Sequence, residues 1–92
     1  MKINLYAMFR QVAGAKYIEL DLRQNSSVPD MLEALLHAHP QLTPLLVDNS
    51  GQLLGHIHIF INGRDIQYLE DGMRTSLAAT DKIDIFPPVA GG

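Results

Sequence analysis

The sequence ends in the stretch Asp81-Lys82-Ile83-Asp84-Ile85-Phe86-Pro87-Pro88-Val89-Ala90-Gly91-Gly92. Its first part alternates two apolar residues, Ile83 and Ile85, with residues of the opposite face, the last of which is Phe86. A period of two is typical of a strand with one buried face. The two prolines that follow have no amide hydrogen and a fixed φ, so they cannot continue the pairing. The stretch therefore predicts a last strand over 82–86 and an extended tail after it.

Two stretches near the start of the chain alternate in the same way. Residues 2–9 and residues 17–22 are both expected to be strands, with these apolar residues facing inward: Ile3, Leu5, Ala7, Phe9, Ile18, Leu20 and Leu22. Ala13-Gly14-Ala15 interrupts the alternation between them. Two such runs joined by a short segment that contains glycine predict an antiparallel hairpin.

The period changes from two to that of a helix between residues 27 and 40. Apolar residues recur from Val28 to His39 at the spacing i, i+3, i+4, i+7, i+8 and i+11, which forms one stripe along a helix. Ser27 can cap this helix, and Asp30 lies in the first turn, where the helix dipole favours a carboxylate. Pro40 ends it, because proline has no amide hydrogen to donate. We expect one amphipathic helix here.

The middle of the chain contains a connector and a second hairpin. Residues 41–55 carry Pro44 and the turn cluster 48–51, which predicts a connector. Alternation resumes over 56–61, with isoleucines at 57, 59 and 61 facing inward and His56, His58 and Phe60 facing outward. Asn62-Gly63 predicts a tight turn. After it we expect only a short strand near residue 66, then irregular chain to residue 79.

The order of these elements is β-β-α-β-(β)-β, which indicates an α+β domain with one main helix packed across one face of a mixed sheet. In such a small sheet, the first and last strands are expected to lie side by side and parallel, as in the β-grasp fold. We therefore predict a β-grasp domain over 1–86 and an extended tail over 87–92.

Composition narrows the class of protein. The chain has 92 residues, 47% of them hydrophobic, which predicts a single domain. It has no cysteine, so disulfides, thiolate metal sites and a cysteine nucleophile are excluded. Seven Lys and Arg residues, spread singly, against ten Asp and Glu residues give a net charge of −3, which argues against nucleic acid as a partner. With neither a long apolar run nor a charged-then-apolar leader, we expect a cytoplasmic protein without a membrane partner.

The tail 87–92 is the main candidate for chemistry. Two prolines stiffen its start, and small residues lead to Gly91 and Gly92. A carboxylate is a poor electrophile until it becomes an acyl phosphate or acyl adenylate, and the protein that performs this step must enclose the terminus. Glycine suits such a channel because it has no Cβ. The sequence has no Walker-type glycine loop, so ATP is expected to be used by a separate activating enzyme, with no cofactor bound here.

This chain resembles the ubiquitin-like sulfur carriers of the MoaD/ThiS family over its whole length, most of all the small subunit of molybdopterin synthase. The specific part of the resemblance is the stretch 81–92, with weaker support from Asn62-Gly63 and residues 1–14. It implies that the Gly92 carboxylate is adenylated by an ATP-dependent enzyme and converted to a thiocarboxylate. It further implies that the sulfur goes to the molybdopterin precursor. The implied partners are the activating enzyme, a sulfur donor protein, and the large subunit of molybdopterin synthase or another sulfur-acceptor enzyme.

One departure leaves the sulfur acceptor open. The stretch Arg64–Leu77 is longer than in compact small subunits of molybdopterin synthase. Longer relatives resemble carriers for cysteine synthesis or tRNA thiolation, or protein modifiers that form isopeptides through the same glycine. A sulfur carrier for thiamine synthesis is a further alternative. A further alternative is a β-grasp interaction module with an inert tail. In none of these does the chain act as an enzyme alone.

The predicted site therefore has two parts. Gly92 bears the reacting carboxylate and Gly91 provides access. A partner is expected to bind the outward sheet face and the tail through the following residues: Phe60, Phe86, Pro87, Pro88, Val89 and Ala90. Tyr6, Met8 and His58 would extend that face, because an apolar patch of this kind marks a partner site more often than it stays exposed to water.

Other residues with chemical potential have simpler interpretations. His56 and His58 share one face of a strand and could present two imidazoles to a metal, but surface or interface histidines are the favoured interpretation, so no metal site is predicted. Ser27 is better explained as a helix cap than as a nucleophile. The carboxylates of Glu70, Asp81 and Asp84 are expected to form a solvated face.

Overall fold

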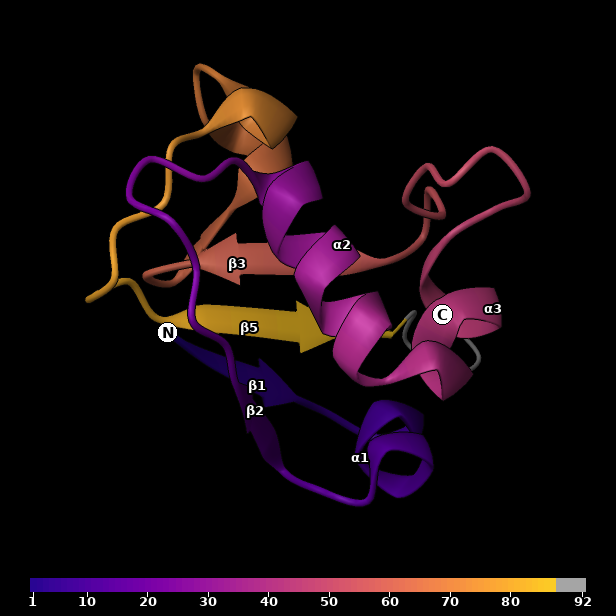
Figure 1. Cartoon of the computed structure of the whole chain (residues 1–92). Coiled ribbons are helices and arrows are strands. Elements are labelled where there is room, and N and C mark those ends of the chain that lie inside the picture. Colours follow the sequence, from indigo (N-terminus) through magenta and orange to yellow (C-terminus); the bar gives the residue numbers. More distant parts are fainter. Residues whose placement is uncertain (88–92) are drawn as a thin grey trace.

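The computed structural model of this chain describes residues 1–87. A single long helix crosses one face of a sheet, and short helices lie at its edges (Figure 1). In chain order the elements are β1 (Lys2–Leu5), α1 (Met8–Ala13), β2 (Tyr17–Glu19), α2 (Val28–Ala38), η1 (Pro40–Leu42), α3 (Thr43–Leu46), β3 (His58–Ile61), β4 (Arg64–Asp65), η2 (Ile66–Tyr68), η3 (Gly72–Arg74) and β5 (Ile83–Phe86).

The sheet is mixed and has five strands in the order β2-β1-β5-β3-β4. Its centre is the parallel pair β1 and β5, which run side by side in Figure 1, with Ile3 opposite Ile83 and Leu5 opposite Ile85. All other strand pairs are antiparallel. The predicted β-grasp fold, including adjacent parallel first and last strands, is confirmed. The predicted boundary between domain and tail follows β5, but Pro88 to Gly92 lie outside the described residues.

Helix α2 forms where the sequence predicts it. The Ser27 hydroxyl accepts a hydrogen bond from the Asp30 amide, and the Asp30 carboxylate accepts one from the Ser27 amide at 2.9 Å, which completes a capping box. These bonds from Ser27 hold the pKa of Asp30 below its ordinary value. The helix ends at Ala38, and Pro40 begins the next short helix. Within residues 1–87 no helix has the length and apolar character needed to cross a membrane.

The core lies between α2 and the sheet. The inward residues of the three central strands and the first four members of the α2 stripe are fully buried or nearly so; the principal ones are Ile3, Leu5, Ile59, Ile83, Ile85, Val28, Met31, Leu32 and Leu35. The last two members of the stripe, Leu36 and His39, are partly buried. These are the positions that the two periods indicate. The helix and the sheet are thus held together by burial of the apolar face of α2 against the apolar face of the sheet.

The first hairpin differs from the prediction. The expected strand over 2–9 ends at Leu5, the one expected over 17–22 ends at Glu19, and the connection between them contains helix α1. Ala7 has φ +53° and ψ −129°, and the Phe9 amide donates to the Tyr6 carbonyl at 3.2 Å, so the chain turns sharply here. Phe9 is buried as expected, but it enters the core from a helix. Ala7 is exposed, because the turn reverses the alternation.

Two smaller predictions are also corrected. The connector 41–55 contains η1 and α3, because Pro40 and Pro44 occupy first-turn positions that tolerate proline, and because Leu42 and Leu46 are buried. The short strand expected near Ile66 is Arg64–Asp65, and Ile66 begins η2. The turn at Asn62-Gly63 is confirmed: both residues have positive φ, 53° and 83°.

Truncating the apolar stripe of α2 tests this packing. Leu32→Ala and Leu35→Ala are each expected to lower the free energy of unfolding by about 2–4 kcal/mol, because both side chains are buried against the sheet. Glu33→Ala, on the exposed side of the same helix, is expected to change it by less than about 0.5 kcal/mol. Urea titration measures all three values. Equal, small losses at the three positions would contradict this packing of α2.

Candidate functional site

Three aromatic rings meet on the sheet face opposite α2, at the end of β5. The rings of Tyr6 and Phe86 are stacked, with centroids 4.2 Å apart and planes at 15°. Phe60, on the neighbouring strand β3, meets Phe86 edge to face at 5.4 Å. The edge-to-face pair has the separation that aromatic rings prefer, and the stacked pair is packed slightly closer than that. We call Tyr6, Phe60 and Phe86 the aromatic cluster; it lies where the chain leaves the sheet.

The aromatic cluster contains two of the predicted partner-binding residues, Phe60 and Phe86. Both are half-buried, and they lie on adjacent strands with their rings in contact, as the predicted face requires. Met8 is not on a strand; it belongs to α1 and is 48% exposed. Pro87 is half-buried next to the cluster along the chain. The remaining predicted site residues lie outside the described residues: Pro88, Val89, Ala90, Gly91 and Gly92.

A carboxylate lies beneath the aromatic cluster. Asp84 is only 5% exposed, so its assignment to a solvated face is wrong. One of its oxygens, Oδ1, accepts hydrogen bonds from the Tyr6 hydroxyl at 2.8 Å and from the Asn4 amide group at 3.1 Å. The Lys82 ammonium lies 4.0 Å from the other oxygen. The hydrogen bond to Asp84, together with burial and the nearby negative charge, raises the pKa of Tyr6.

The backbone around Tyr6 holds the ring in a confined position. Tyr6 follows the last residue of β1 and precedes Ala7, whose positive φ is the conformation that glycine normally takes at this turn position. Arg10 of α1 lies over the Tyr6 ring at 5.0 Å and donates from Nε to the Leu5 carbonyl at 2.6 Å. Sequence patterns assign Tyr6 to the outward face, but they contain no signal for the turn or for Arg10.

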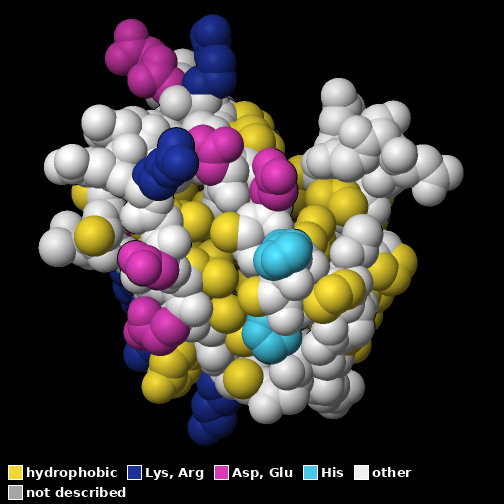
Figure 2. Space-filling model, viewed as in Figure 1, with side chains coloured by type: hydrophobic (Ala, Val, Ile, Leu, Met, Phe, Trp, Pro, Cys, Tyr) yellow, Lys and Arg dark blue, Asp and Glu magenta, His cyan; other side chains and the backbone are white. Residues whose placement is uncertain are grey.

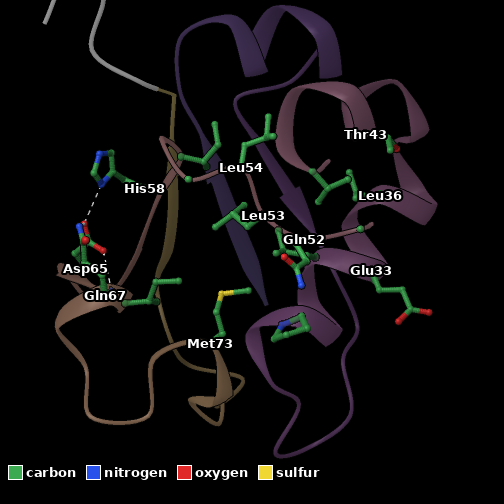
Figure 3. A pocket seen from close by; sticks show the side chains of 17 residues that line it. Glu33, Leu36, Thr43, Gln52, Leu53, Leu54, His58, Asp65, Gln67 and Met73 are labelled. Carbon is green, nitrogen blue, oxygen red and sulfur yellow. Dashed lines mark hydrogen bonds and ion pairs between the residues drawn. The ribbon is translucent and has the colours of Figure 1, made fainter. Parts of the chain in front are cut away.

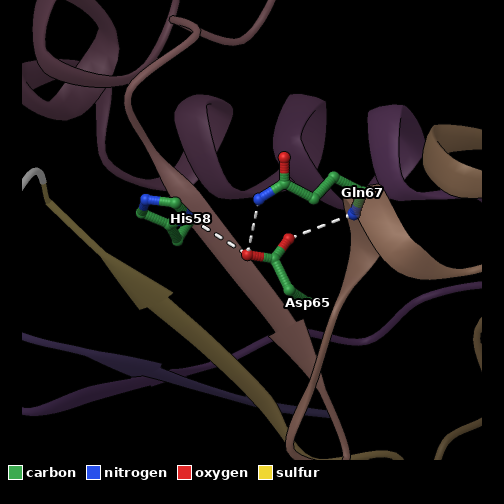
Figure 4. A network of polar contacts seen from close by, with 3 residues as sticks. All are labelled: His58, Asp65 and Gln67. Carbon is green, nitrogen blue, oxygen red and sulfur yellow. Dashed lines mark hydrogen bonds and ion pairs between the residues drawn. The ribbon is translucent and has the colours of Figure 1, made fainter.

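A second polar group lies on β3 and β4 (Figure 4). His58 Nδ1 donates to the Asp65 carboxylate at 3.0 Å, and Asp65 also accepts from the backbone amide and the side-chain amide of Gln67, each at 3.0 Å. Burial opposes the charge on Asp65, but the hydrogen bonds from Gln67 and His58 outweigh it and lower its pKa. The hydrogen bonds to the charged Asp65 carboxylate therefore stabilise the fold above the ordinary aspartate pKa. This stabilisation is lost as the pH falls through the lowered pKa of Asp65.

His58, Asp65 and Gln67 lie at the rim of a groove of about 860 Å³ between α2, the loop 51–57 and the η2–η3 segment. In Figure 3, Leu53 and Leu54 lie between His58 on one side and Leu36 of α2 on the other. Figure 2 shows apolar side chains at the base of the lobe that projects beside this hollow. The sequence did not predict the groove, because it forms only when two irregular segments pack beside the helix.

The longer stretch Arg64–Leu77 packs near α2 and leaves the aromatic cluster uncovered. Its last residue, Leu77, is buried, and the Leu77 amide donates to the Ser26 carbonyl at 2.8 Å, immediately before the helix. Met73 packs against the core from the side of the groove. Among residues 1–87 no group of three or more His, Cys, Asp or Glu side chains could hold a metal ion.

Comparison with known proteins places this geometry in a family. The model of the ThiS family matches residues 3–92. Small archaeal modifier proteins 3 and 1 of Haloferax volcanii are each 35% identical over 92 residues, which cover 100% of this chain and 98% and 100% of those proteins, respectively.

A solved structure and a shorter match agree with this. The crystal structure of the modifier protein SAMP1 from Haloferax volcanii has a TM-score of 0.87 at 33% identity, over 99% of this chain and 97% of that chain. A protein of Archaeoglobus fulgidus named as a candidate sulfur carrier is 40% identical over 47 residues, 51% of this chain and 52% of that protein. The chain therefore belongs to the ThiS family of ubiquitin-like β-grasp sulfur carriers and protein modifiers, which includes the small archaeal modifier proteins.

Proposed function

We propose that this protein is a carrier whose reacting group is the carboxylate of Gly92, and that it acts in the cytoplasm with a separate ATP-dependent activating enzyme. The observation that supports this most directly is the course of β5. The central strand of the sheet leads through Phe86 and Pro87 into the sequence that ends in Gly91 and Gly92, and the ThiS model matches this sequence as far as residue 92.

The chemistry requires two displacements. In the first, an oxygen of the Gly92 carboxylate attacks the α-phosphate of ATP, and pyrophosphate leaves. In the second, hydrosulfide (HS⁻) released by a sulfur donor protein attacks the acyl carbon, AMP leaves with the former carboxylate oxygen, and the sulfur loses its proton to solvent. The product is a Gly92 thiocarboxylate. Neither displacement uses a side chain of the carrier, which agrees with the family: its members are substrates of other proteins and are not catalysts themselves.

We propose that the sulfur is delivered to the molybdopterin precursor, on the large subunit of molybdopterin synthase. The resemblance of the stretch 81–92 to the small subunit of that enzyme supports this acceptor. Sulfur transfer for cysteine, thiamine or tRNA uses the same thiocarboxylate and differs only in the acceptor enzyme.

A second candidate function is protein modification. It is favoured by the two relatives that are named as modifier proteins and that match over essentially their full length. In this case a lysine amine, rather than sulfur, displaces AMP and forms an isopeptide with Gly92. Recovery of a tagged chain from cells under denaturing conditions distinguishes the functions, because lysine-linked adducts of Gly92 are expected only for the modifier.

Changes at the terminus test the central proposal. Deleting Gly92, or adding residues after it, is expected to abolish sulfur loading and leave the thermal midpoint unchanged, because the tail begins with two prolines and no core contact is predicted for it. Gly91→Val should have the same effect, because a β-branched side chain would obstruct a channel built for bare backbone. The measurement is intact-protein mass spectrometry after incubation with ATP, the activating enzyme and a sulfur donor.

A matched control distinguishes an obstructed tail from a general effect of replacing a glycine by valine. Gly55→Val places the same side chain where no atom lies within 4 Å of the added Cβ and where φ is not positive, so this variant is expected to load sulfur like the wild type. Wild type should show one oxygen exchanged for sulfur. Normal loading of the chain without Gly92 would end the carrier proposal.

Charge in the aromatic cluster tests the partner surface. Phe86→Asp, and to a smaller extent Phe60→Asp, is expected to weaken binding of the activating enzyme by about 2 kcal/mol or more, because a carboxylate would be desolvated in the interface. Tyr68→Asp is the control, since Tyr68 is 79% exposed and belongs to η2. Titration calorimetry measures the affinities, and circular dichroism checks the fold. Equal affinities for Phe86→Asp and Tyr68→Asp would show that the cluster is not the docking surface.

A further inference from the structure

We propose that Asp84, acting through Tyr6, is a positioning residue for the tail. Its hydrogen bond holds the Tyr6 ring against Phe86 and so sets the direction in which the chain leaves β5. This inference rests on the proposed function, because the direction of the tail matters only if the Gly92 carboxylate must reach an activating site.

The first step concerns what holds Tyr6. The residue lies beyond the last paired position of β1, Leu5, so the strand ladder does not orient its side chain. The positive φ of Ala7 turns the chain away immediately afterwards. A non-glycine residue in this conformation persists only when its surroundings hold it there. At the turn itself, the Phe9 amide donates to the Tyr6 carbonyl and the Arg10 amide to the Ala7 carbonyl. The Tyr6 side chain is held by the hydrogen bond to Asp84 at 2.8 Å, the stack on Phe86 at 4.2 Å and the Arg10 guanidinium at 5.0 Å.

The second step concerns why an aspartate occupies position 84. A buried carboxylate loses its hydration, and an apolar side chain of similar size in such a position is often as stable or more so. Asp84 therefore adds little that stability requires. Asp84 instead fixes the position of the Tyr6 ring. A hydrogen bond to a carboxylate oxygen depends on angle and distance, whereas apolar packing alone would leave the ring several positions of similar energy. The Asn4 amide group donates to the same oxygen at 3.1 Å and holds the carboxylate itself in place.

The third step carries the position of Phe86 into the tail. A residue that precedes proline is restricted to extended backbone, and Pro87 and Pro88 each have a fixed φ. The path from Phe86 through two prolines therefore has few free torsions. The ladder with His58 of β3 pairs the Phe86 backbone on one side, and the stack on Tyr6 holds its ring on the other, so the direction in which the chain leaves Phe86 depends on both. Displacement of a reacting group by about 1 Å can cost on the order of 100-fold in rate.

A single hydroxyl tests this inference. Tyr6→Phe keeps the ring and removes only the donor to Asp84. With the activating enzyme of the source organism and varied carrier concentration, ATP–pyrophosphate exchange is expected to show a kcat lower by about tenfold. The KM for the carrier is expected to change by less than about threefold, because the apolar docking surface is retained. Asp84→Asn keeps an oxygen acceptor for Tyr6 and is expected to retain a kcat near that of wild type, whereas Asp84→Ala is expected to resemble Tyr6→Phe.

Tyr17→Phe is the matched control. Tyr17 lies on β2, is 48% exposed, and its hydroxyl makes no hydrogen bond within residues 1–87. The thermal midpoint of every variant is measured, so that kcat is compared well below the unfolding transition. A rise in KM with an unchanged kcat would make Tyr6 a docking contact and overturn the inference. So would kinetics equal to those of Tyr17→Phe.

A second measurement does not need the activating enzyme. In nitrogen-15 relaxation NMR, the order parameter of the Phe86 amide is expected to fall in Tyr6→Phe relative to wild type and Tyr17→Phe. In aromatic carbon-13 relaxation NMR, flipping of the Phe86 ring is expected to accelerate in the same comparison. Unchanged Phe86 dynamics would overturn the inference even if the enzyme assay succeeds. If wild-type carrier is never adenylated, the proposed function fails, and the NMR comparison alone decides whether Asp84 positions Phe86.

Discussion

The parallel pairing of β1 with β5 is the constraint on which the rest of the structure depends. It joins the beginning of the chain to its last strand, and its inward residues, Ile3, Leu5, Ile83 and Ile85, are all fully buried. A shift of the register by one residue would expose these side chains and bury polar ones, so the pairing has one stable register. That register brings Tyr6 and Phe86, the next residue of each strand, together, and the antiparallel pairing of β3 with β5 adds Phe60 to complete the aromatic cluster.

The two faces of this sheet have different physical characters. The face toward α2 is held by apolar packing, which is strong but has little directional preference. The opposite face combines aromatic rings with a buried carboxylate. A hydrogen bond to a charged acceptor contributes about 1.5–3 kcal/mol, but removal of a carboxylate from water costs several kcal/mol. The polar contacts of Asp84 therefore define a geometry more than they stabilise the fold, and they do so where the tail begins.

The errors of prediction occur where a local pattern is compatible with more than one structure and contacts between distant residues decide between them. The strand over 2–9 was expected to continue because Ala7 and Phe9 fit the alternation, but Ala7 takes a backbone conformation that normally indicates glycine. No local pattern reveals this, because the turn places Phe9 in the core from a helix, and that burial depends on residues distant in the sequence. Asp84 was expected in solvent because strand patterns distinguish only two faces, and the outward face of β5 is covered locally by Tyr6. Pro44 suggested irregular chain, although it is also compatible with a helix start.

The sequence by itself determined the local elements of this protein: the capping box at Ser27 and Asp30, the apolar stripe of α2, the inward phase of each central strand and the glycine-ended tail. These follow from spacing over a few residues, which is where backbone geometry has its effect. Only the tertiary structure decided that the Tyr6 hydroxyl meets the Asp84 carboxylate, because these residues are separated by 78 positions in the chain. Such a contact depends on which strands become neighbours, and neighbours are chosen by the burial of the whole core rather than by any local pattern.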